Sequence, residues 1–90
     1  MRILDKRELD EIVTEELNSY ESYLLQSVND NSEFKYLEHI AEKYSLDKNV
    51  VIDKNLDIFN WYMKNNVDEY QSKVMSLYLT HEQVMRECIK

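Results

Sequence analysis

The amino-acid sequence predicts an all-α fold, a small bundle of four to five helices joined by short Asn-rich turns. Apolar residues recur at three- and four-residue steps through most of the 90 residues, which is the spacing of helices with one buried face. The chain contains no glycine and no proline, so side-chain caps must begin and end its elements. Asp, Asn, Ser and Thr stand between the periodic segments as candidate caps, and we expect a single helical domain over residues 1–90.

The first helix is predicted to begin after Asp5, with Glu8 at the third helical position, and to run to about residue 28. Glu16 interrupts its apolar stripe. We expect either that the stripe is frayed there or that Glu16 pairs with a Tyr hydroxyl or a Lys. The stripe itself consists of Leu9, Ile12, Val13, Leu17, Tyr20, Leu24 and Val28.

A second helix is predicted to begin between Asp30 and Ser32 and to end near Ser45. The β-branched run Val50-Val51-Ile52 lowers helix propensity, but a lone strand there has no evident partner, so we favour a helix. The buried stripe of this third helix is predicted to contain Ile52, Leu56, Phe59 and Met63.

Two capping boxes are expected in the last third of the chain. Asn66 with Glu69 is predicted to begin a fourth helix, and Thr80 with Gln83 to begin a short fifth helix. In this arrangement His81 falls in the first turn of the fifth helix, where its ring is expected to be solvated or to act as a cap.

Composition gives expectations about source and compartment. Ala, Gly, Arg and Pro are scarce while Asn, Lys, Ile and Tyr are abundant, which favours an AT-rich bacterial, phage or mobile-element genome. The single Cys88 excludes an intrachain disulfide and fits a reducing compartment. The first residues lack the apolar run of a signal peptide, and no apolar stretch is long enough to cross a bilayer. The expectation is a cytoplasmic protein without membrane association.

The sequence disfavours three kinds of site: calcium binding, transition-metal binding and direct nucleic-acid binding. The segment beginning at Asp53 matches the first five positions of an EF-hand loop, but Ile58 replaces the required Gly and Lys64 the bidentate Glu. His81, Met85 and Cys88 share a helix face without the spacing of a metal site. No segment is clearly basic, so direct nucleic-acid binding is disfavoured. We predict no catalytic residue, cofactor or metal, and therefore no enzyme.

Charge gathers in the first third of the chain. Residues 1–33 carry nine acidic and three basic side chains, a net charge of −6. Glu8, Glu11 and Glu15 are predicted to form one ridge of the first helix, opposite its apolar stripe. The simplest interpretation is an ordinary solvated face. The functional one is a negative surface that steers a basic partner.

Three apolar or aromatic residues lie off the predicted stripes and are candidate partner contacts: Leu25, Tyr36 and Trp61. For Trp61, core packing in a helix buried on two sides is the favoured interpretation, and an exposed indole that anchors a partner is the alternative. The leading hypothesis is a cytoplasmic regulator or inhibitor that docks onto another protein with a basic surface, as phage-encoded inhibitors, immunity proteins and antitoxins do. The alternatives are a self-associating structural protein, such as a homodimer, and a nucleic-acid-linked transcription regulator.

Overall fold

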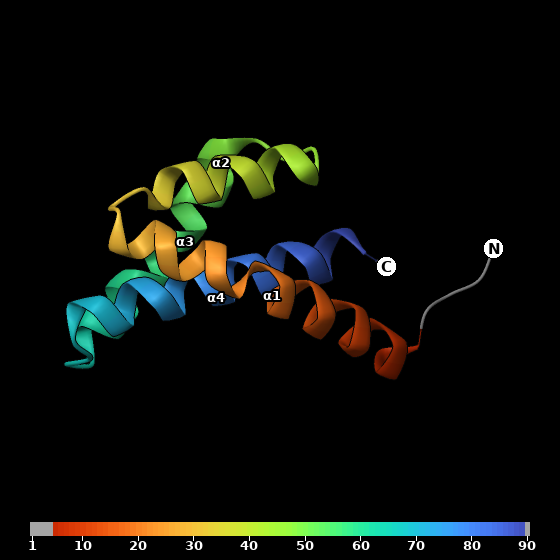
Figure 1. Cartoon of the computed structure of the whole chain (residues 1–90), viewed down its shortest axis with the longest axis horizontal. Helices are drawn as coiled ribbons and strands as arrows, with labels where there is room; N and C mark the ends of the chain where they lie inside the picture. The colour runs from red at the N-terminus through yellow and green to blue at the C-terminus, as the bar shows by residue number, and fades with distance from the viewer. Residues whose placement is uncertain (1–4, 90) are drawn as a thin grey trace.

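Four α-helices make up the computed structural model, which describes residues 5–89 (Figure 1). They are α1 (Lys6–Asn29), α2 (Glu33–Lys43), α3 (Lys48–Lys64) and α4 (Glu69–Cys88). The all-α prediction is confirmed, and no strand occurs within the described residues. Residues 50–52 are helical, as expected. The predicted fifth helix is wrong, because residues 80–83 lie inside α4.

Aspartate side chains begin three of the four helices. Asp5 accepts a hydrogen bond from the backbone N–H of Glu8 at 2.8 Å, as predicted for α1. Asp47 caps α3, and Asp68 caps α4 by accepting from the N–H groups of Tyr70 and Gln71. The predicted cap at Asn66 is therefore wrong, since the helix begins two residues later.

Asn66 instead occupies the left-handed backbone region, together with Asn31 and Ser45, with φ values of 63°, 55° and 56°. Each of the three residues follows the end of a helix. After each, a backbone N–H donates to a carbonyl five residues earlier, as Ser32 does to Ser27 and Leu46 to Ala41, both at 2.8 Å. These are Schellman motifs, which usually place glycine at this position.

The main core forms where all four helices meet. It contains Leu24 and Val28 of α1, Tyr36, Leu37, Ile40 and Ala41 of α2, Val51 of α3, and Leu77 and Val84 of α4. A smaller cluster of Val13, Leu17 and Met85 joins α1 to α4. In Figure 1 the first turns of α1 extend past α2 and α3, beside the end of α4.

The buried face of α3 differs from the predicted stripe. Val51 and Asn55 are buried, whereas Leu56 and Met63 are 42% and 41% exposed. Each buried residue thus stands one position before a residue of the predicted stripe, Val51 before Ile52 and Asn55 before Leu56. One residue corresponds to a rotation of about 100° around the helix axis. Packing on α4 sets this rotation, and Thr80 on α4 donates a hydrogen bond to Asn55 Oδ1 at 3.2 Å.

No helix within residues 5–89 combines the length and the apolar character needed to cross a bilayer.

Candidate functional site

A polar network with a buried centre joins α1, α2 and α4. Glu16 Oε2 lies 2.9 Å from His81 Nε2, and His81 Nδ1 lies 2.7 Å from the Tyr36 hydroxyl. Lys43 donates to Glu16 Oε1 at 2.5 Å, and the Tyr44 hydroxyl also donates to Glu16. We call these five residues the Glu16–His81 network. The prediction that Glu16 pairs with a Tyr or a Lys is confirmed, and it pairs with both.

Electrostatics define the proton positions in this network. Burial lowers the pKa of His81 despite the neighbouring Glu16 carboxylate. Burial by itself favours a neutral Glu16, but hydrogen bonds from Lys43, Tyr44 and His81 outweigh it and lower the pKa of that carboxyl. Burial also raises the pKa of Tyr36. The neutral imidazole therefore donates from Nε2 to an ionised Glu16 and accepts from the Tyr36 hydroxyl at Nδ1.

The chain of carboxylate, imidazole and phenol has the components of a proton relay, but its centre has no exposed surface. Tyr36 and His81 are both fully buried. The expectation of a solvated or capping His81 is wrong, because α4 is continuous and turns this side chain toward α1 and α2. The network connects three helices, and its exposed part lies at Lys43 and, to a smaller extent, at Glu16.

Two predicted surface contacts are corrected by the same packing. Tyr36 lies in the main core, since α4 covers its side of α2 and supplies His81 as its hydrogen-bond partner. Leu25 is partly buried against that core. The ring of Tyr20 packs edge-on against both Tyr36 and His81, with centroids 6.1 and 4.7 Å apart. Tyr36 and Leu25 therefore provide little or no surface for a partner.

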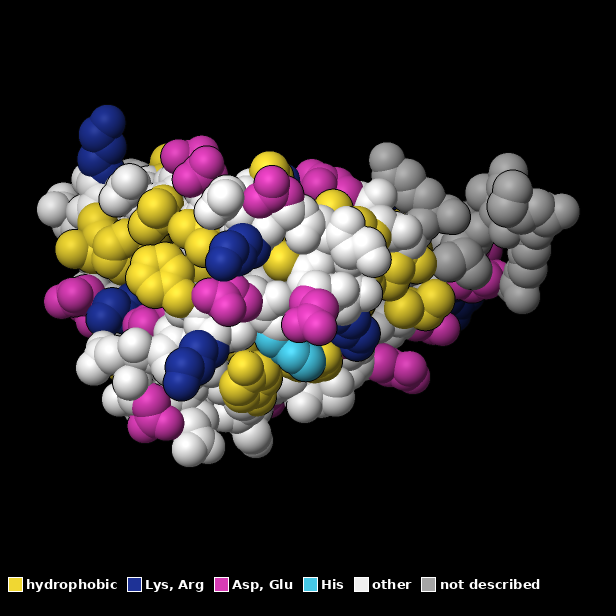
Figure 2. Space-filling model, turned by 90° about the horizontal axis from the view of Figure 1, so that it is seen from above, with side chains coloured by type: hydrophobic (Ala, Val, Ile, Leu, Met, Phe, Trp, Pro, Cys, Tyr) yellow, Lys and Arg dark blue, Asp and Glu magenta, His cyan; other side chains and the backbone are white. Residues whose placement is uncertain are grey.

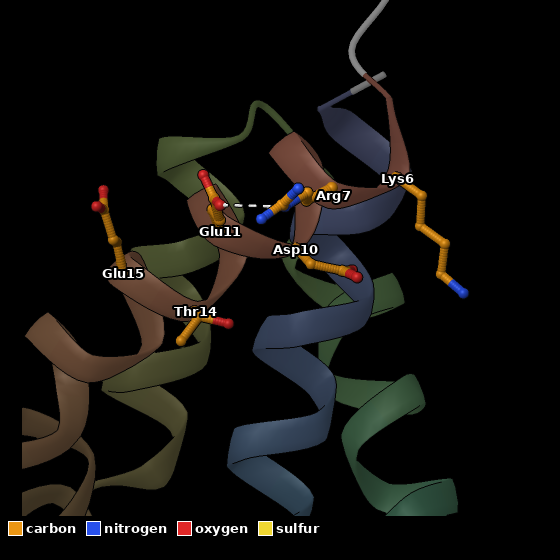
Figure 3. Close-up of a pocket in the computed structure, with 6 residues that line it drawn as sticks. All are labelled: Lys6, Arg7, Asp10, Glu11, Thr14 and Glu15. Atoms are coloured by element: carbon orange, nitrogen blue, oxygen red, sulfur yellow. Dashed lines mark ion pairs between the residues drawn. The ribbon is translucent and has the colours of Figure 1, made fainter.

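The predicted acidic ridge lies on α1, where it borders a shallow depression (Figure 3). Glu11 and Glu15 line the depression and are exposed, while Glu8 is half-buried. Lys6 and Arg7 line the same depression, and Arg7 Nε lies 4.0 Å from Glu11 Oε1. In Figure 3 the side chains of Glu11 and Glu15 extend away from the bundle. Their role in partner binding remains a prediction.

Trp61 projects from α3 with 60% of its surface exposed, so the favoured expectation of core packing is wrong and the alternative of an exposed indole is correct. Its indole packs edge-on against Tyr62, with ring centroids 5.1 Å apart. A shallow depression lies on each side of it. Ile58, Tyr62 and Leu79 line one and Asn60, Met63 and Lys64 the other, and both include Asp57 and Trp61.

The other flank of α3 is also apolar. Leu56 is exposed there, and Phe34 at the start of α2 is 57% exposed. Phe34 and Leu56 line one groove between the two helices. Figure 2, which views the molecule from the α2 side, shows hydrophobic side chains gathered on the surface toward one end. The sequence missed this surface, because Leu56 was assigned to the core.

Within residues 5–89, no group of three or more His, Cys, Asp or Glu side chains is placed to hold a metal ion. His81 uses both ring nitrogens in the Glu16–His81 network, Met85 is buried, and Cys88 is exposed. No protein-family model, curated protein or solved structure matches this chain.

Proposed function

We propose that this protein is a small non-catalytic regulator or inhibitor that docks stoichiometrically onto a partner protein, with α3 as the main contact. The exposed apolar side chains of α3 are the observation that carries the proposal. Leu56 lies on one flank of this helix and Trp61 on the other, and Met63 lines a depression together with Trp61. A helix that packs only within its own domain normally presents polar residues to water, whereas apolar patches rimmed by polar residues mark interaction surfaces.

Trp61 is the proposed anchor of the contact. An indole brings a large, rigid apolar area to an interface, and Trp is enriched among residues that dominate binding energy. Trp61 lines two depressions, which offer a partner space next to the indole. The edge-on contact with Tyr62 supports the ring in its exposed position.

Charge supports a basic partner. The net charge of −7 attracts a positively charged protein and raises its association rate. Glu8, Glu11 and Glu15 are the proposed contributors on α1. The amino-acid composition is typical of an AT-rich genome, which supports a phage or mobile-element protein of the inhibitor, immunity or antitoxin type. The free, exposed Cys88 supports a reducing compartment such as the cytoplasm.

Self-association is the second candidate, because the same uncovered flanks of α3 fit a symmetric contact between two copies. The net charge opposes it, since two copies repel each other.

The test is affinity capture from a lysate of the source cells, followed by mass spectrometry and purification of the captured protein. Trp61→Ala is expected to weaken binding of the purified partner at least about tenfold, or about 1.4 kcal/mol. Its thermal stability should change by no more than about 0.5 kcal/mol, because the indole is largely exposed.

Tyr70→Ala is the matched control, since it removes an aromatic ring of similar exposure, 48%, from α4. It should leave the affinity unchanged. Failure to recover a stoichiometric partner, or equal losses for Trp61→Ala and Tyr70→Ala, would sink the proposal. A stability loss of about 3–5 kcal/mol for Trp61→Ala would instead place the indole in a core.

A further inference from the structure

A groove of about 170 Å³ lies where α2, α3 and α4 meet, on the flank of α3 opposite Trp61. A cavity of about 150 Å³ accommodates benzene, and small-molecule pockets begin near about 300 Å³. The groove is therefore sized for one large apolar side chain. It is lined by Glu33, Phe34, Leu37, Asn55, Leu56, Phe59, Lys73 and Ser76.

The lining is mainly apolar, and two of its polar groups already have partners within the chain. Leu37, Asn55 and Ser76 are buried, whereas Phe34 and Leu56 are exposed. Asn55 Oδ1 accepts a hydrogen bond from Thr80, and Ser76 Oγ donates to a backbone carbonyl. An apolar occupant therefore leaves both hydrogen bonds intact. Its burial in the groove deprives neither Asn55 Oδ1 nor Ser76 Oγ of a partner.

One end of the groove carries excess negative charge. Lys73 Nζ lies 3.6 Å from Glu33 Oε1 and 3.8 Å from Glu69 Oε1, so two carboxylates share one ammonium group. Glu33 Oε1 is shielded from water and accepts no hydrogen bond. A second cation at this end is favourable, because the Glu69 side chain is exposed, Glu33 is partly exposed, and charge-assisted bonds are the stronger ones.

Apolar side chains continue from the groove along α3. Leu56, Phe59 and Met63 stand at positions i, i+3 and i+7, so they form one line along the helix. Such a line is the contact surface of a helix that packs alongside another helix.

We propose that this groove binds an amphipathic basic helix of a partner protein. An apolar side chain of that helix enters between Phe34 and Leu56, and a neighbouring Lys or Arg reaches Glu33 and Glu69. The proposal rests on the proposed function of α3 as a docking helix and adds the chemistry of the partner. A second copy of this chain fits less well, since it carries the same net charge of −7.

The experiment uses two synthetic helical peptides of about five turns that share one leucine stripe. One has lysines flanking the stripe and the other has glutamates. Each is titrated into the full chain at about 0.15 M ionic strength and followed by NMR. The lysine peptide is expected to bind at least about tenfold more tightly, with shift changes centred on Leu37, Leu56 and Phe59.

Matched variants separate groove binding from general attraction to an acidic protein. Leu56→Ser should weaken the lysine peptide at least about fivefold. Val50→Ser should not, because Val50 is a 56% exposed residue of α3 that does not line the groove. Glu33→Gln should reduce the preference for lysine over glutamate, whereas Glu11→Gln on α1 should reduce it less.

Equal binding of the two peptides, no binding up to about millimolar concentration, or equal losses for Leu56→Ser and Val50→Ser would overturn this inference. If the captured partner depends on Trp61 while the lysine peptide ignores the groove, the proposed function stands and only this inference fails. If the peptide binds the groove but capture does not depend on Trp61, the anchoring role in the proposed function fails instead.

Discussion

Glu16 lies within the apolar stripe of α1, yet it is among the best-bonded side chains of the molecule. Lys43, Tyr44 and His81 all donate to its carboxylate. A charge removed from water is tolerated only when it is paired and hydrogen-bonded. The sequence predicted the kind of partner for Glu16, because a carboxylate on an apolar stripe requires one. His81 was missed, since the contact joins residues 65 positions apart.

The network predicts loss of stability in acid. Because burial lowers the pKa of His81, the unfolded chain binds this proton at a higher pH than the folded chain does. The contribution of the neutral His81 to the free energy of unfolding is complete above about pH 6.5 and decreases as the pH falls below that value. The lowered pKa of Glu16 adds a second loss below about pH 4.5. Urea unfolding midpoints measured between about pH 8 and pH 4 should fall accordingly.

His81→Gln is the control for this prediction. The variant lowers stability at every pH, because it changes a buried hydrogen-bonded residue. Its midpoint should nevertheless vary less between about pH 7 and pH 5 than that of the unmodified chain. An identical slope in the two proteins would assign the acid sensitivity to other groups.

At the scale of the helix, the side chains predict where helices form better than they predict which face of a helix is buried. Asp5 caps α1 as expected, because Asp followed three residues later by Glu is a local signal. Thr80 resembled a second such signal, but it lies in the middle of α4, where the carbonyl of Ser76 and Asn55 Oδ1 share its single hydroxyl proton. The rotation of α3 was also missed. Its sequence offers two adjacent apolar faces, and only the fit against α4 selects between them.

The turns give a prediction of their own. Ser45 is held in the left-handed region at φ 56°, where glycine has no steric penalty. Ser45→Gly is expected to stabilise the protein by about 0.5–1 kcal/mol, or to raise the melting temperature by roughly 2–8 °C. Asn31→Gly and Asn66→Gly should give smaller gains, because Asn tolerates this region better than Ser does. Thermal unfolding followed by circular dichroism measures all three.

Ser22→Gly is the matched control, since Ser22 is an exposed residue inside α1. This substitution should lower the free energy of unfolding by about 0.5 kcal/mol, because glycine destabilises a helix interior. A loss at Ser45→Gly as large as at Ser22→Gly would show that its left-handed turn carries no strain.

At the scale of the whole molecule, opposing features act on association. The described chain is 43 Å long and 23 Å across, and α3 leaves apolar side chains uncovered on its surface. Burying those side chains favours self-association, while the net charge of −7 opposes it. The negative charge causes repulsion between any two copies of the chain, whereas it attracts a partner with a basic surface.

We therefore expect a monomer in sedimentation velocity at low ionic strength, over a concentration range up to about 100 µM. Raising the salt to about 1 M screens the repulsion and should permit weak association at most. Trp61→Ala and Leu56→Ser should reduce any association that does appear. A tight dimer at low salt would favour the self-association alternative over docking on a different protein.

The sequence alone predicts that this chain forms helices, that the first two begin at Asp5 and near Ser32, and that Glu16 requires a partner. These are local properties, set by periodicity, by caps and by the chemistry of single side chains. Only the tertiary structure decided that Tyr36 and His81 meet inside the core, and that Leu56 and Met63 face water beside a groove. Those outcomes depend on how α4 packs against α2 and α3, and a helix with two apolar faces does not encode which one its neighbours will cover.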